Sequence, residues 1–220
     1  MTHARHGDGP TGVLPADTAD AGTRGRLLTV ARSVFARAGY KGASIRAITS
    51  EAGANLGAVT YHFGTKRDLY TAVLESVMGP LEPRIREAVA GPGPGLERML
   101  RAVRAFFGHL SENPDQPGLM MQEIAAGRGA PEPVLRVVQA TLAVLAETVR
   151  EGQRDGSIRE GDPHLLTLSS IAQPVYLTLV RRLAPPVLGR VVPEAGGSRV
   201  PDHIVEFVRR GLAAAPGGAT

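Results

Sequence analysis

Apolar residues recur every three or four positions along most of the chain from Thr23 onward, which is the spacing of one side of an α-helix. No segment alternates apolar and polar residues for long enough to indicate a β-sheet. The pattern therefore predicts an all-α protein. The first apolar stripe covers residues 24–38 and consists of Leu27, Leu28, Ala31, Val34, Phe35 and Ala38.

Three short helices are predicted near the N-terminus, over about residues 24–38, 45–52 and 56–62. Ser44 and Asn55 precede the second and third of these helices, and both residue types are good N-caps. The link between the second and third helices is only a few residues long, as a helix-turn-helix motif requires. The sequence therefore predicts a three-helix domain with this motif at its centre.

A fourth helix is predicted to begin after Thr65, where Thr65 and Asp68 are spaced like the two partners of a capping box. Further helices are expected up to about residue 212, with Asp162 as the N-cap of a long helix that Pro174 should kink. We divide the chain into four parts. These are a disordered tail (1–22), a helix-turn-helix domain (23–70), a ligand-binding and dimerisation domain joined to it through the fourth helix (71–215), and a short tail (216–220).

The third helix has two different sides. At 100° per residue, Leu56, Val59 and Phe63 fall within about 60° of one another and are expected to face the core. The other side is small and polar, and an exposed surface of Gly and Ala adds little stability but lets the backbone approach another surface closely. We predict that this side enters a DNA major groove. It consists of Gly57, Ala58, Thr60, Tyr61 and His62.

Each polar side chain in this region has a proposed contact. Ala58 and Thr60 are placed to touch base edges or a thymine methyl group, and Tyr61 and His62 to donate hydrogen bonds to phosphates. Lys66 would reach a phosphate together with the first amides of the fourth helix. The alternatives are that Tyr61 packs against the first helix and that His62 is simply solvated.

The positive charge of the chain is concentrated in the same region. The formal net charge is +4; residues 23–70 carry eight Lys or Arg and two acidic residues, residues 1–22 one Arg and three Asp, and residues 71–220 sixteen of each sign. A basic domain on a neutral body is typical of nucleic-acid-binding proteins. Arg46 lies on the outer side of the second helix, where it is either a DNA contact or an ordinary surface charge.

The C-terminal half offers candidates for a ligand pocket and a dimer interface. Polar residues inside apolar runs and side chains beside the kink could orient a ligand, and an apolar pocket would suit a hydrophobic or amphipathic effector. The alternative is that the apolar candidates are core. The helix over residues 163–183 is apolar on more than one side, so it and the last helix are predicted to form the interface with a second copy. The pocket candidates are Phe106, His109, Met120, Glu123, Gln173 and Tyr176.

Residues 23–70 resemble the N-terminal DNA-binding domain of the TetR family of transcriptional regulators. The resemblance rests on the end of the first helix at Phe35–Tyr40, on Ser44–Ile48, on the turn at Ala52–Asn55, and above all on the run Tyr61-His62-Phe63-Gly64-x-Lys66. The C-terminal half is faintly similar to the branch that includes the multidrug-transport regulator CecR.

The resemblance implies an all-helical homodimer of about nine helices that binds a near-palindromic operator. It also implies a ligand cavity in the larger domain and a four-helix dimer interface built from the last two long helices. Asn55 stands where many members of the family have Ser or Thr, and all three residue types can cap a helix. The family's DNA contacts correspond to Ser44, Arg46, Asn55, Gly57, Ala58, Thr60, Tyr61, His62 and Lys66.

Several classes of protein fit the sequence poorly. Cysteine is absent, which excludes disulfides and suits the cytoplasm, and neither a membrane span nor a signal peptide is recognisable. We find no phosphate loop, nucleophile elbow or helical histidine pair outside the N-terminal tail, so we predict no enzymatic activity, cofactor or metal. The sequence favours a ligand-responsive repressor. The alternatives are a nonspecific architectural DNA-binding protein and a helical small-molecule-binding protein or enzyme.

Overall fold

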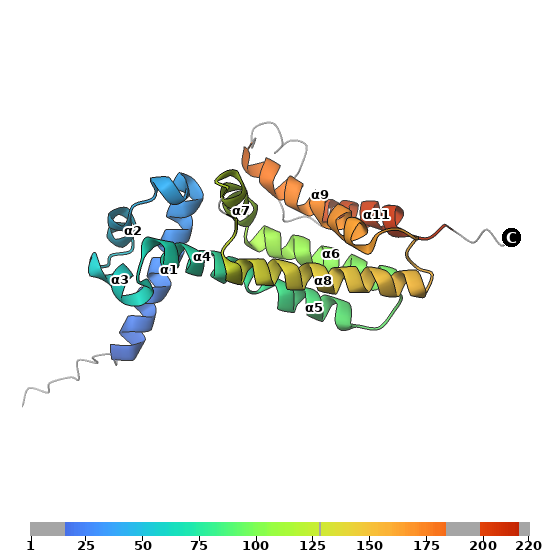
Figure 1. Cartoon of the computed structure of the whole chain (residues 1–220), viewed down its shortest axis with the longest axis horizontal. Helices are drawn as coiled ribbons and strands as arrows, with labels where there is room; N and C mark the ends of the chain where they lie inside the picture. The colour runs from blue at the N-terminus through green and yellow to red at the C-terminus, as the bar shows by residue number, and fades with distance from the viewer. Residues whose placement is uncertain (1–15, 128, 184–198, 216–220) are drawn as a thin grey trace, which may run out of the picture.

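The chain forms an elongated assembly of α-helices with a small domain at one end and a larger bundle at the other (Figure 1). The computed structural model describes residues 16–127, 129–183 and 199–215, and no strand is present among them, which confirms the predicted all-α fold. Residues 1–15 and the tail at 216–220 lie outside the described residues. None of the described helices is long and apolar enough to cross a membrane.

The small domain, here called the head, consists of α1 (Ala16–Gly42), α2 (Ile45–Glu51), α3 (Gly57–Phe63) and the start of α4 (Lys66–Met78). The bundle follows. Its described helices are α5 (Leu81–Ala90), α6 (Gly95–Glu112), α7 (Gln116–Ala125), α8 (Glu132–Arg154), α9 (Pro163–Leu183) and α11 (Arg199–Leu212).

Helix α1 begins earlier than predicted. Residues 16–22, which we expected in a disordered tail, form the first turns of α1. The predicted stop at Gly39 is real, since Gly39 has a φ of 69° inside the element, a backbone conformation that favours glycine. One further turn then carries the chain to Gly42. The early turns make a contact to α3 through Asp20, described below, which local sequence does not reveal.

Of the four predicted N-caps, three are confirmed by hydrogen bonds and one is wrong. The Ala47 amide donates to Ser44 Oγ at 3.1 Å, and Thr65 and Asp68 form the reciprocal capping box, which lowers the pKa of the Asp68 carboxyl. The prediction for Asn55 is wrong, because α3 is preceded by Leu56 and no side chain caps it. The Asn55 carbonyl, rather than its side chain, accepts from the Ala58 amide at 3.1 Å.

The fourth predicted cap, Asp162, is also confirmed: its Oδ1 accepts from the amides of His164 and Leu165 at 2.8 and 3.1 Å. Helix α9 then continues through Pro174 to Leu183. The pair Gly79-Pro80 separates α4 from α5.

The bundle is held by unusually close packing of α6 on α8. A Cβ atom added at Gly95 would lie 2.3 Å from the Gly152 Cα atom, so the two backbones touch. The first amides of α6 are satisfied by the loop after α8, with Gly95 N donating to Asp155 Oδ2 at 2.7 Å and Leu96 N to Ser157 Oγ at 3.0 Å. Hydrogen bonds from the Ser157 hydroxyl, which is the largest cause, and from the Gly95 amide lower the pKa of Asp155.

We expect Gly95→Ala to destabilise the protein, because the new methyl group would overlap the Gly152 backbone, which cannot move without separating α6 from α8. The cost should be at least ~1–3 kcal/mol, the range for overpacked sites. Chemical denaturation at fixed protein concentration measures it. Gly118→Ala on α7 is the matched control, since nothing lies within 4 Å of its Cβ position. It should be neutral or stabilising by up to ~1 kcal/mol, and equal stability of the two variants would contradict the close packing.

Candidate nucleic-acid interface and internal cavity

The outer side of α3 is exposed in the structure. Tyr61 is 76% exposed, and Gly57 and Thr60 are exposed beside it, whereas Val59 is 2% exposed and packs into the core of the head. The alternative that Tyr61 packs against the first helix is therefore wrong. The result is a short helix that presents a hydroxyl, a phenol and bare backbone to solvent.

Two residues lie on the opposite side from the one predicted. Leu56 is 61% exposed, although we expected it in the core, and Ala58, which we expected on the outer side, is 8% exposed. The prediction from a rotation of 100° per residue fails at Leu56 because that residue precedes the helix. Ala58 then occupies the inward position, where its small side chain allows α3 to pack closely. Phe63 is half-buried, with the Arg24 guanidinium 5.0 Å from its ring centroid.

His62 is neither a solvated side chain nor a free phosphate donor. Its side chain is 7% exposed, and its Nε2 atom lies 3.3 Å from Asp20 Oδ1 on the first turns of α1. The imidazole and Arg24, which contacts Phe63, together tie the N-terminal part of α1 to α3. Sequence reasoning missed Asp20 because its partner is 42 positions away and the segment was read as a tail.

The remaining predicted DNA contacts lie around α3 in different settings. Ser44 caps α2 and is exposed, as are Arg46 and Asn55. Lys66, at the first turn of α4, places its Nζ atom 4.7 Å from the centroid of the Tyr40 ring. That ring belongs to an aromatic cluster with Phe35 and Tyr70, which holds α1 against α4.

The charge of the head is largely uncompensated. Of its eight Lys and Arg residues between 23 and 70, three form ion pairs: Arg32, Arg37 and Arg67. Within the described part of the chain no carboxylate pairs with the other five, which are Arg24, Arg26, Lys41, Arg46 and Lys66. A polyanion is the natural partner of such a surface.

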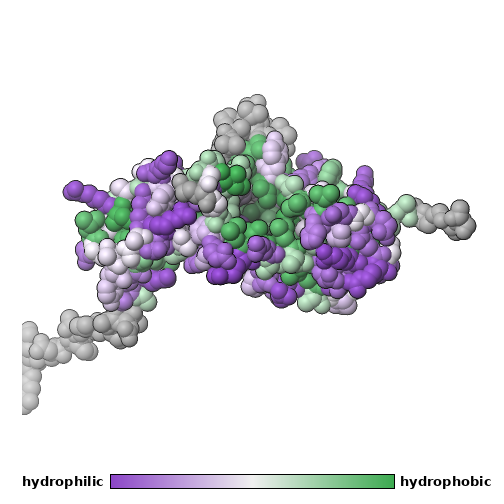
Figure 2. Space-filling view, viewed as in Figure 1, coloured by the Kyte–Doolittle hydropathy of each residue, from purple (hydrophilic) through white to green (hydrophobic). Residues whose placement is uncertain are grey.

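The bundle contains an apolar cavity of about 210 Å³. Figure 2 shows apolar residues gathered around a hollow near the middle of the molecule. The lining comes from α4 to α9 and is largely aliphatic, aromatic or thioether. It consists of Met78, Leu81, Phe106, Leu110, Gln116, Pro117, Met120, Met121, Ile124, Val138, Thr141, Leu142, Ile171 and Val175.

The structure brings two of the six predicted pocket residues, Phe106 and Met120, to this cavity. His109 is 1% exposed and Glu123 0% exposed, but neither lines it. Gln173 and Tyr176 do not line it either; Tyr176 is 63% exposed. The polar residues that do line it are Gln116 and Thr141. Both were missed, because the direction of a polar side chain in a bundle depends on tertiary packing.

Helix α7 joins the cavity to the head. Its acidic residues face the head: Arg32 on α1 donates two hydrogen bonds to Asp115, which precedes α7, with Nε to Oδ2 at 2.7 Å. This pairing raises the pKa of the Arg32 guanidinium above its ordinary value. Arg67 on α4 lies 3.6 Å from the buried Glu123 carboxylate. The Glu123 side chain thus serves the contact between domains.

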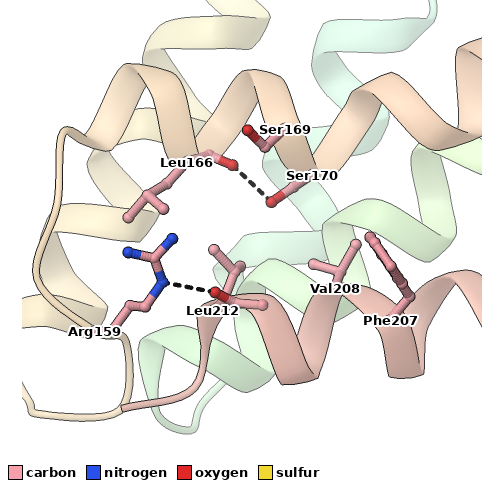
Figure 3. A pocket seen from close by; sticks show the side chains of 8 residues that line it. Arg159, Leu166, Ser169, Ser170, Phe207, Val208 and Leu212 are labelled. Carbon is pink, nitrogen blue, oxygen red and sulfur yellow. Dashed lines mark hydrogen bonds between the residues drawn. The ribbon is translucent and has the colours of Figure 1, made fainter. Parts of the chain in front are cut away.

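A smaller hollow of about 120 Å³ lies between α9 and α11 (Figure 3). Two of its polar groups are already engaged, since Ser170 Oγ donates to the Leu166 carbonyl at 2.7 Å and Arg159 Nε to the Gly211 carbonyl at 2.8 Å. This hollow is a gap in the packing between two helices, and it offers few free polar groups to a ligand.

Comparison with known proteins agrees with this geometry. Residues 27–73 match the family model described as "Bacterial regulatory proteins, tetR family". The transcriptional activator FasR of Mycolicibacterium smegmatis is 36% identical over 84 residues, 38% of each chain. The repressor KstR2 of Mycobacterium tuberculosis is 31% identical over 84 residues, 38% of this chain and 42% of its own. The chain therefore matches only about two-fifths of the length of these curated relatives.

Solved structures share the whole fold. A tetR family regulatory protein from Rhodococcus RHA1 gives a TM-score of 0.71 at 19% identity, covering 88% of this chain and 98% of its own. The structure of the ketosteroid transcriptional regulator KstR2 gives 0.67 at 21% identity, covering 87% and 95%. Residues 27–73 thus form a helix-turn-helix domain that matches the tetR family model, as the resemblance of residues 23–70 predicted. The similarity of the C-terminal half of the chain to the CecR branch stays a prediction.

We expect Asp115→Asn to loosen the head from the bundle, because it removes the charge that the half-buried Arg32 guanidinium pairs with. The loss should be about 1–3 kcal/mol, the range for a hydrogen bond to a charged group. Denaturation gives the total, and faster amide hydrogen exchange in α1 and α7 localises it. The control is Glu112→Gln, which breaks an exposed pair with Arg84 inside the bundle and should cost less than ~1 kcal/mol. Equal effects of the two variants would show that the interdomain pair has no special role.

Proposed function

We propose that this protein is a dimeric, ligand-responsive transcriptional repressor that binds a near-palindromic operator and releases it when a small molecule binds. The observation that carries the proposal is the exposed side of α3 in a head where, among the described residues, five cations have no carboxylate partner; residues 71–220 carry no net charge. The names of the relatives include an activator, FasR, and the repressors KstR2 and NicS. We propose repression for this chain.

The proposed DNA contacts follow from exposure. Gly57, Thr60 and Tyr61 would meet the major groove, and the exposed Leu56 joins them as an apolar contact for a thymine methyl group or a sugar. Phosphates on either side would bind side chains and helix N-termini. Ala58 and His62 instead hold α3 in place from its inner side. The flanking contacts are Ser44, Arg46, Asn55 and Lys66.

The proposed dimer forms through α9 and α11. Large apolar side chains on these two helices are exposed in the single chain: Leu165 is 64%, Leu168 49%, Tyr176 63% and Phe207 58% exposed. Covering them requires a second helical surface, and an identical pair of helices would make a four-helix interface. A twofold axis there would place two α3 helices in successive major grooves, ~34–36 Å apart.

Release of the operator requires the cavity to communicate with α3. We propose two routes: α4, which carries Met78 at the cavity and Lys66 at the head, and α7, which carries Met120 at the cavity and Glu123 at the head. A ligand that moves either helix changes the distance between the two heads of a dimer. The coupling needed is modest, since ~1.4 kcal/mol changes affinity tenfold.

We expect Tyr61→Ala to weaken operator binding by about 10–100-fold, because a hydrogen bond to a charged phosphate contributes roughly 1.5–3 kcal/mol. The operator is first found by mapping the genomic sites that the protein occupies, and affinity is then measured on that DNA and on unrelated DNA at moderate salt. Tyr61→Phe keeps the ring and removes the hydroxyl, so it separates the contribution of the ring from that of the hydrogen bond. Thermal stability should not change, since Tyr61 is exposed. Unchanged affinity for Tyr61→Ala would remove this contact from the proposal, and equal binding to unrelated DNA would favour a nonspecific DNA-binding protein.

We expect Leu168→Glu to convert the dimer to a monomer, because the substitution would bury an unpaired carboxylate in an apolar interface. Light scattering during size-exclusion chromatography measures the molar mass. Leu135→Glu is the matched control, since Leu135 is 38% exposed on α8, outside the proposed interface. A mass of one chain for the unaltered protein, or loss of the dimer in the control alone, would place the interface elsewhere.

A further inference from the structure

The walls of the cavity carry no charge. None of the residues that line it is acidic or basic. Thr141 and Gln116 are its polar members, and the Thr141 hydroxyl is occupied, because it donates to the Val137 carbonyl at 2.8 Å. An ionised ligand would lose its hydration there without gaining a partner, which costs several kcal/mol or more. The cavity therefore favours a neutral guest.

Gln116 is the exception among these satisfied walls. It is 5% exposed and lines the cavity; its Nε2 atom donates to Met78 Sδ at 2.8 Å, and its Oε1 atom is buried without a hydrogen-bond partner. The orientation of the amide follows from chemistry, because a thioether sulfur accepts hydrogen bonds but cannot donate them. With the amide nitrogen on Met78, the oxygen keeps an acceptor lone pair open to the cavity. A ligand donor that fills it would offset part of the roughly 1–3 kcal/mol that an unpaired buried polar atom costs.

His109 lies behind Gln116 and also meets its side chain. Burial lowers the pKa of the His109 imidazole, which is 1% exposed, and hydrogen bonding to the Gln116 side chain and the Val77 carbonyl partly opposes this shift. The Gln116 oxygen has a second lone pair that a ligand can use. The guanidinium that acts on the same imidazole, Arg84, is paired with Glu112, so among the described residues no free cation at this end of the cavity balances an acidic ligand.

We propose that the cavity selects a neutral, largely apolar molecule that carries one hydrogen-bond donor, such as a hydroxyl group, and that Gln116 Oε1 accepts this donor. This inference names the ligand class of the proposed effector site and so rests on the proposed function. Size limits the guest further. A cavity of ~150 Å³ binds benzene, so about 210 Å³ accommodates a single ring with a short substituent or a chain of similar bulk.

The test uses three small probes and no DNA. 4-Ethylphenol and 4-methylanisole are isomers of the same bulk, but only the phenol donates a hydrogen bond. p-Toluate is of similar size and negatively charged. The five methionines make the site visible: in protein labelled with ¹³C at the methionine methyl groups, Met78, Met120 and Met121 report on the cavity. Met99, buried elsewhere in α6, is the internal control.

We expect 4-ethylphenol to shift the signals of the three lining methionines and to bind about tenfold more tightly than 4-methylanisole, as one hydrogen bond allows. p-Toluate should produce no shift at the same concentration. Gln116→Leu should remove the preference for the phenol while keeping the apolar contacts. Gln139→Leu, the same change at an exposed position of α8, should keep it.

Equal binding of the two isomers, tighter binding of p-toluate, shifts absent from the lining methionines, or a preference that survives in Gln116→Leu would each overturn the proposal. The order of affinities for the three probes in the unaltered protein tests the proposal even if the Gln116 variant folds poorly. The proposed function fails separately: if 4-ethylphenol binds as expected but no cavity ligand ever alters operator affinity, the ligand class stands and ligand-controlled repression does not.

Discussion

The position of α7 depends on burying acidic groups against arginines of another domain. Glu123 is fully buried and Asp115 nearly so, and a buried carboxylate without a cation is too costly to persist. Arg32 on α1 and Arg67 on α4 supply the positive charge. These pairs therefore fix where α7 lies between the head and the bundle. Because α7 also forms one wall of the cavity, the geometry of the cavity is set partly by the DNA-binding domain.

This shared helix gives the cavity a physical route to the head. The side of α7 that faces the cavity presents Met120 and Met121, which are flexible side chains that adapt to different guests. Its other side is held by directional ion pairs, which do not tolerate small displacements as apolar contacts do. A ligand that shifts α7 would therefore strain or break the ion pairs that α7 makes with α1 and α4. Two discrete arrangements of such pairs are the kind of element on which allosteric coupling depends.

The exposed side of α3 is useful for recognition only if the helix is rigid, and three kinds of contact hold it. Val59 and Ala58 pack inward, the Asp20 carboxylate holds His62, and the Arg24 guanidinium lies over the Phe63 ring. The extra turns of α1 supply one of these contacts, through Asp20. An isolated helix of seven residues would not be stable in water, so α3 owes its shape to the domain around it.

The sequence alone determined the helices, most of their caps and the DNA-binding domain. These signals are local: apolar spacing, the Ser44 cap and the Thr65–Asp68 box each act within a few residues. Only the tertiary structure decided which side of α3 faces inward, that Asp20 meets His62, and that Gln116 rather than Gln173 lines the cavity. Such choices depend on packing and pairing between residues far apart in the chain. The apolar periodicity of a helix predicts which of its sides is buried, but not which residues of other helices that side contacts.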